Sequence, residues 1–191
     1  MHLSGITCAL SDSADALVEL VLREKTTLGY RVSFDVNYRP ALWSAAQARD
    51  RLRTLGRQAD VVLVGLDEAQ RLWGTHDANQ VRELFPEPHS VVVKDGGNEA
   101  VESLVDHGAL STFRVPAQRV EVVEPVGAGD AFAAGYLASR LRGDGPQQRL
   151  SAGHRLAAWT LESTADFRPL VAASNGSPAG LTRAGAEQAT S

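Results

Sequence analysis

Residues 124–135 (EPVGAGDAFAAG) contain the residue types in this sequence that are best suited to anion binding and acid–base catalysis. Gly127, Ala128 and Gly129 carry no bulky side chains, so the backbone N–H groups at the start of the following helix can approach an anion closely. The helix dipole favours negative charge at the same place. Asp130 falls in the first turn of that helix, where a carboxylate can act as general base on a hydroxyl. These features suit transfer of a phosphoryl group, whose oxygens carry charge in the transition state.

A structural explanation of the same residues stays open at this point. A Gly-x-Gly turn before a helix is often only a tight connection, and an aspartate in a first helical turn is often only a surface residue that suits the helix dipole. The turn alone therefore does not decide between a catalytic and a structural role.

The elements that must position this turn follow an alternating pattern of strands and helices. Strands are predicted at 1–7, 31–36, 61–65 and 91–94, a hairpin at 99–114 with its turn at 106–108, and an extended stretch at 119–123. Helices are predicted at 12–28, 44–58, 67–73, 77–85, 128–141 and 147–164. Ser11 or Asp12 could cap the helix at 12–28, and Gly29 could end it. This alternation predicts an α/β fold of parallel βαβ units.

Composition narrows the class of protein. The 191 residues suit one domain, with 43% hydrophobic and 22% charged residues, as in globular proteins. The net charge is −4 and no basic stripe stands out, which disfavours nucleic-acid binding. The single cysteine, Cys8, allows no intramolecular disulfide or cysteine-rich zinc cluster. No run approaches the length of a membrane span and no signal-peptide pattern is present, so a cytoplasmic location is expected. We expect one domain to take residues 1–172, and 173–191, rich in Ser, Gly, Ala and Thr, to be a disordered tail.

The segment EPVGAGDAFAAGYLA (124–138) resembles the signature of PfkB/ribokinase-type carbohydrate kinases, D-[TP]-[TV]-G-A-G-D followed by a helix of small residues. The resemblance implies a three-layer, ribokinase-like (Rossmann-like) sheet with helices on both faces, and the use of ATP and Mg²⁺. It makes Asp130 the catalytic base and assigns the anion hole to the amides of Gly127, Ala128 and Gly129. Glu124 replaces the first aspartate of the signature, where it could lie near the metal.

Residues 33–43 (SFDVNYRPALW) resemble the D-x-N-Y-R-x-x-L-W pattern of the 2-keto-3-deoxygluconate kinase branch. The resemblance places Asn37 beside the nucleotide, and Tyr38 and Arg39 beside the substrate. A guanidinium such as that of Arg39 can grip a carboxylate with two hydrogen bonds. Asp166 matches a position that contacts sugar hydroxyls in that branch.

Other family positions fall along the rest of the chain. Glu68 matches the glutamate of the N-x-x-E motif, whose asparagine is Gly65 here, and could help to hold Mg²⁺ through water. Lys94 and Gly96 match the K-x-G-x-x-G turn that borders the ATP site, whose last glycine is replaced by Glu99. His154 falls where relatives place an asparagine near the adenine.

The resemblance covers residues 1 to about 170 but only the later part of a complete family member. The N-terminal portion, which supplies the β-sheet lid over the sugar, is expected to be absent. Two hypotheses follow: an ATP-dependent kinase of a sugar or sugar acid, with 2-keto-3-deoxygluconate favoured, or a truncated, inactive remnant that at most binds nucleotide. A small-molecule substrate is the partner expected, without nucleic acid or membrane, and a homo-oligomer stays open. A dinucleotide-binding dehydrogenase is excluded, because the glycine-rich turn comes late and no acidic residue follows on a next strand.

Overall fold

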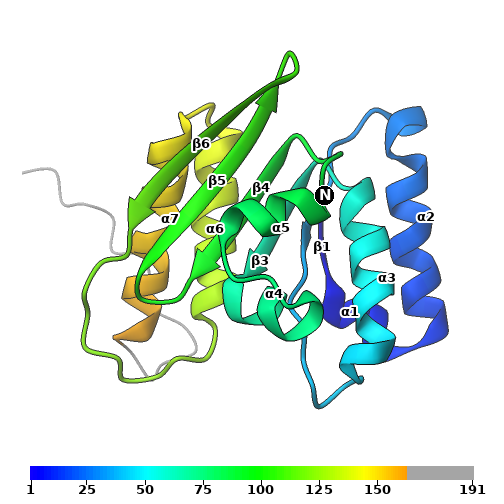
Figure 1. The fold of residues 1–191 in the computed structure, drawn as a ribbon, viewed down its shortest axis with the longest axis horizontal. Coiled ribbons are helices and arrows are strands. Elements are labelled where there is room, and N and C mark those ends of the chain that lie inside the picture. Colours follow the sequence, from blue (N-terminus) through cyan, green and yellow to red (C-terminus); the bar gives the residue numbers. More distant parts are fainter. Residues whose placement is uncertain (163–191) are drawn as a thin grey trace, which may run out of the picture.

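The computed structural model describes residues 1–162, which form one mixed sheet between layers of helices (Figure 1). The strands lie in the sheet in the order of the chain. Neighbouring strands are parallel from β1 to β4, and β5 and β6 form the predicted antiparallel hairpin. Their bounds are β1 His2–Ser4, β2 Ser33–Asp35, β3 Val61–Gly65, β4 Ser90–Asp95, β5 Glu99–Asp106 and β6 Ala109–Pro116. The α/β prediction, with parallel βαβ units, is confirmed.

The helices match the predicted pattern closely where local signals define them. Their bounds are α1 Gly5–Leu10, α2 Asp12–Leu28, α3 Ala45–Gln58, α4 Leu66–Trp73, α5 Ala78–Leu84, α6 Ala128–Leu141 and α7 Pro146–Leu161. Ser11 caps α2 by accepting the N–H of Ala14, and Gly29 ends the helix with a left-handed φ of 71°. In the part of the chain described, no helix is long and apolar enough to cross a membrane.

Two predicted extended segments differ from the structure. The strand predicted at 1–7 stops at Ser4, whose side chain accepts the N–H of Ile6 and so starts α1. Gly5 permits this turn, because a Cβ at that position would lie 2.1 Å from the carbonyl oxygen of Val36. The stretch predicted as extended at 119–123 joins no strand of the sheet. Its last residue, Val123, instead donates its N–H to the carbonyl of Leu161, at the end of α7.

The two faces of the sheet bury two separate cores. Val62 and Val64 of β3 point into a core covered by α1 to α5, whereas Val61 and Leu63 point into a second core beneath α6 and α7. We call these the α1–α5 core and the α6–α7 core. Because side chains alternate along a strand, one run of buried valine and leucine serves both cores. The predicted three-layer arrangement is therefore confirmed.

Helix α6 is anchored to the sheet by a buried carboxylate. Glu102 of β5 is fully buried, and its Oε1 accepts hydrogen bonds from Ser90 Oγ and Tyr136 Oη, both at 2.7 Å. Arg140 and Arg149 form ion pairs with the same oxygen at 3.5 and 3.4 Å. Since Tyr136 lies on α6 and Arg149 on α7, this cluster fixes both helices on the strands that they cover.

Candidate active site

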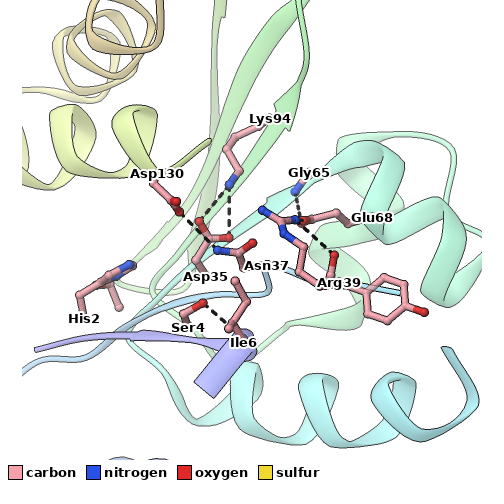
Figure 2. A network of polar contacts seen from close by, with 12 residues as sticks. His2, Ser4, Ile6, Asp35, Asn37, Arg39, Gly65, Glu68, Lys94 and Asp130 are labelled. Atoms are coloured by element: carbon pink, nitrogen blue, oxygen red, sulfur yellow. Dashed lines mark hydrogen bonds and ion pairs between the residues drawn. The ribbon is translucent and has the colours of Figure 1, made fainter. Parts of the chain in front are cut away.

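Several of the predicted site residues lie where parallel strands end, together with Asp35, which was not predicted. Asp35 is the last residue of β2, Gly65 the last of β3, and Lys94 the last but one of β4, where it is aligned with Gly65. Helix α6 begins at the same edge of the sheet (Figure 2). The carboxyl ends of parallel strands are the usual place for ligand sites in α/β proteins.

The glycine-rich turn precedes helix α6, as the sequence predicts. Gly127 precedes α6 with φ 84° and ψ −10°, a left-handed conformation that glycine adopts without steric cost. No side chain of the described residues caps this helix end. The N–H of Ala128 is directed at the carbonyl of Pro125, at a long 3.4 Å, and Asp130 lies in the first turn. The helix start therefore offers its positive dipole end and backbone donors to an anion.

Asp130 is held by a hydrogen bond from Asn37, which lies in the loop after β2. Asn37 Nδ2 donates a hydrogen bond of 3.3 Å to Asp130 Oδ1 (Figure 2). Asn37 is buried and has a positive φ of 39°, which asparagine tolerates better than most residues. Asp130 itself is exposed. The carboxylate is thus oriented through one oxygen and accessible to a hydroxyl.

Lys94 and Asp35 form a second charged contact beside the turn. Lys94 Nζ lies 3.0 and 3.2 Å from the two carboxylate oxygens of Asp35, whose side chain is only 2% exposed. The same Nζ is 3.8 Å from the position that a Cβ on Gly129 would take. The sequence predicted a site role for Lys94 but none for Asp35. Its position at the end of an apolar strand, two residues before Asn37, could have indicated that it lies in the site.

Arg39 and Glu68 meet at the opposite end of this group. Glu68 accepts the N–H of Gly65 at 2.9 Å and forms an ion pair with Arg39 at 3.6 Å (Figure 2). Burial raises the pKa of the Glu68 carboxyl, partly offset by the nearby Lys94 ammonium. The guanidinium of Arg39 stays half-exposed and accessible to a ligand. Tyr38 is not brought to this group: its ring is buried in the α1–α5 core, and its hydroxyl donates to the carbonyl of Trp43.

A pocket of about 600 Å³ opens beside the glycine-rich turn. Volumes of this order are typical of small-molecule sites. It is lined by Lys94, Gly96, Gly97, Glu99, Ala117, Gln118, Arg119, Val120, Val122, Pro125, Ala128, Gly129, Phe132, His154, Ala157, Ala158 and Leu161. The phosphate-suited turn and an apolar surface from α6 and α7 therefore share one cavity.

His154 belongs to the apolar part of this pocket. Its Nε2 lies 3.0 Å from the carbonyl oxygen of Val115, so Nε2 carries the proton and donates. Its ring packs edge-on against Phe132, with 5.2 Å between ring centroids. Burial lowers the pKa of His154, which keeps the imidazole neutral at pH 7. Its position suits contact with a flat apolar ligand rather than with phosphate.

Glu99 and Glu124 have partners within the protein. Glu99 forms an ion pair with Arg114 across the β5–β6 hairpin. Gly96 adopts a positive φ of 48° in the β4–β5 turn. Glu124 accepts the N–H of Val126 at 3.1 Å, which shapes the turn. Asp166 lies outside the described residues. Among residues 1–162, no group of three or more His, Cys, Asp or Glu side chains is close enough to hold a metal ion.

The left-handed conformation of Gly127 leads to a prediction. Gly127→Ala should lower the free energy of unfolding by about 1 kcal/mol, because a Cβ is strained at positive φ, and should also weaken binding of MgADP, the class of ligand that the sequence resemblance implies. Gly143→Ala is the matched control: Gly143 has φ 83°, a Cβ there would meet no atom within 4 Å, and the residue follows the C-terminal end of α6, at the opposite end of that helix from Gly127. We expect the control to lose similar stability and no nucleotide affinity, as measured by denaturation and calorimetry. Equal loss of affinity in both variants would contradict a binding role for the turn.

Comparisons with known proteins agree with this geometry. The family model described as pfkB family carbohydrate kinase matches residues 1–171. The chain is 31% identical to 2-dehydro-3-deoxygluconokinase of Escherichia coli K12 over 169 residues, 85% of this chain and 54% of that protein. It is 30% identical to 2-dehydro-3-deoxygalactonokinase of Haloferax volcanii over 166 residues, 82% of this chain and 49% of that protein. The chain thus spans about half the length of the curated relatives it matches.

Solved structures show the same fold. A PfkB protein from Polaromonas sp. JS666 superposes with a TM-score of 0.74 and 29% identity, covering 84% of this chain and 52% of that one. Aminoimidazole riboside kinase from Salmonella enterica, in complex with aminoimidazole riboside and an ATP analogue, gives a TM-score of 0.71 and 25% identity. The second comparison covers 86% of this chain and 56% of that one.

Proposed function

The chain belongs to the pfkB family of carbohydrate kinases, and we propose that its site transfers the γ-phosphoryl group of ATP to a hydroxyl of a sugar acid. The observation that carries the proposal is the position of Asp130, in the first helical turn after the left-handed Gly127 and hydrogen-bonded by Asn37. The nucleotide pocket and the general base thus meet at one helix start.

The proposed transfer needs little covalent chemistry from the protein. Asp130 takes the proton of the acceptor hydroxyl, whose oxygen forms a bond to the γ-phosphorus while the bond from that phosphorus to the β–γ bridging oxygen breaks. ADP leaves with the bridging oxygen. The amides at the start of α6 and the ammonium of Lys94 stabilise charge on the transferring group.

Magnesium fits this site through the nucleotide rather than through a cage of side chains. Mg²⁺ commonly binds substrate phosphates and keeps several waters. Glu68 and Glu124 each accept a backbone N–H group with one carboxylate oxygen, and we expect their contacts with the metal to run through water. When bound, Mg²⁺ would neutralise phosphate charge, with Glu68 as the residue that we expect to orient its water.

The acceptor proposed is 2-keto-3-deoxygluconate. Two features support it: the chain is similar to proteins named 2-dehydro-3-deoxygluconokinase, and Arg39 offers a half-exposed guanidinium near Glu68. A sugar acid brings a carboxylate that this guanidinium can pair with, whereas fructose and ribose do not.

A second candidate function is nucleotide binding without transfer. Asp130 and Gly129 are exposed in the described residues, whereas phosphoryl transfer requires a site closed to water. A site that stays open would still bind MgATP through the pocket and the turn.

An assay of ADP release tests the proposal. With MgATP, the chain should turn over 2-keto-3-deoxygluconate faster than fructose or ribose. The Arg39→Gln variant should lower kcat/KM for the sugar acid by about tenfold, the contribution of one charge-assisted pair, and leave the value for fructose unchanged. Equal loss for both sugars would contradict the role of Arg39. No turnover by folded protein that binds MgATP in calorimetry would favour the second candidate.

A further inference from the structure

Asp35 is a buried carboxylate that belongs neither to the glycine-rich turn nor to the lining of the pocket, and no role has yet been assigned to it. It ends β2, and its side chain is 2% exposed. An ionised carboxylate in the interior is costly unless it is paired and hydrogen-bonded. Both of its oxygens accept from one donor, Lys94 Nζ, at 3.2 and 3.0 Å.

The Asp35–Lys94 ion pair joins two strands that are not neighbours in the sheet. Asp35 lies on β2 and Lys94 on β4, and β3 runs between them. Asp35 is aligned with Leu63 of β3, and Lys94 with Gly65. Leu63 points into the α6–α7 core, so the pair lies on the face of the sheet that α6 covers.

The crossing places the ammonium beside the phosphate-suited turn. Lys94 Nζ lies 3.8 Å from the position of a Cβ on Gly129, and both residues line the nucleotide pocket. A free lysine has a long flexible stem that must be ordered when it binds an anion. Anchoring the ammonium beforehand removes that cost and fixes the charge where the anion arrives.

We infer that Asp35 is a positioning residue, which holds the Lys94 ammonium at the start of α6 as a fixed cationic partner for nucleotide phosphates. This inference rests on the proposed function, because it requires that the pocket binds a nucleotide. Asp35 acts through Lys94 and contacts no phosphate. A purely structural ion pair would stabilise the strand ends without changing affinity for phosphate.

Calorimetric titrations of the full chain with MgATP and with adenosine distinguish these roles. Asp35→Asn should weaken MgATP binding by about tenfold, the contribution of one charge-assisted contact, and leave adenosine binding unchanged. Lys94→Met should show the same selective loss. The double variant should bind MgATP no more weakly than Lys94→Met, since residues that act as a unit are not additive.

Asp60→Asn is the matched control. Asp60 is also paired with a lysine, Lys25 at 3.2 Å, and precedes the start of β3, at the opposite end of that strand. We expect the control to change neither affinity. If Asp35→Asn does not fold, Lys94→Met and the double variant still decide, because any further loss in the double variant overturns the inference.

Two other results overturn the inference. These are an unchanged MgATP affinity in Asp35→Asn and an equal loss of adenosine affinity in that variant. Failure of the wild-type chain to bind either ligand is a separate outcome, which overturns the proposed function and the inference together.

Discussion

The Asp130→Asn variant should transfer phosphate about a thousandfold more slowly than the wild-type chain, as expected when a general base is lost, with unchanged affinity for MgATP. The amide keeps the shape of the carboxylate, and its oxygen can still accept the hydrogen bond from Asn37. It cannot take a proton from the acceptor hydroxyl. Because the backbone donors at the start of α6 are retained, nucleotide binding is expected to persist. ADP release and calorimetry on the same preparation measure the two effects.

Asp67→Asn provides the matched control for this variant. Asp67 is an exposed aspartate in the first turn of α4, at the same edge of the sheet, so its replacement changes the net charge equally. We expect it to retain the wild-type rate. A comparable rate loss in Asp67→Asn, or a rate near the wild type in Asp130→Asn, would contradict the assignment of Asp130 as base.

The Gly135→Ala variant should destabilise the protein by about 3 kcal/mol, at the upper end for overpacking. A Cβ on Gly135 would lie 2.5 Å from the carbonyl oxygen of Ala152 and 3.2 Å from Cα of Gly153. Both neighbours are backbone atoms of α7, so no change of side-chain rotamer can relieve the clash. Helices α6 and α7 must move apart, although the Glu102 cluster ties both to the sheet. Denaturant unfolding followed by circular dichroism measures the loss.

The sign of this effect is informative in itself. At an unhindered helix position, replacing glycine by alanine stabilises a protein by up to about 1 kcal/mol. Gly97→Ala serves as the control, because Gly97 has open space around its Cβ position and no positive φ. It should change stability little. A Gly135→Ala variant as stable as the wild type would show that α6 and α7 pack less closely than in the structure.

Local signals made much of the fold predictable from the sequence. Ser11 and Gly29 mark the ends of α2, and the continuous apolar run at 61–65 identifies β3. Both signals come from residues that are adjacent in the chain, so they can be recognised without knowledge of the tertiary structure. The turn before Asp130 was predictable for the same reason. Its small residues, its left-handed glycine and its helix start are contiguous in the chain.

Features that depend on packing between distant segments were not predictable. The switch from β1 to α1 depends on the contact of Gly5 with the backbone of Val36. The Asp35–Lys94 pair depends on two strands that lie on either side of β3. Tyr38 and Arg39 are neighbours in the segment that predicted substrate contacts for both, yet the ring of Tyr38 is buried in the core and the side chain of Arg39 is half-exposed. Which side of an irregular segment is buried is decided by the helices that cover it.

The division of the interior into two cores has a consequence for how such a protein can evolve. Arg39, which is proposed to bind the acceptor, follows β2 directly after Tyr38 of the α1–α5 core, whereas Asp130 and the apolar part of the proposed nucleotide pocket rest on the α6–α7 core. Mutations that remodel the loop after β2 need not disturb the packing beneath α6. Selection can therefore alter the preferred acceptor while the half with the proposed phosphate-transfer site is inherited unchanged, so that one ancestral scaffold can give rise to kinases of many sugars.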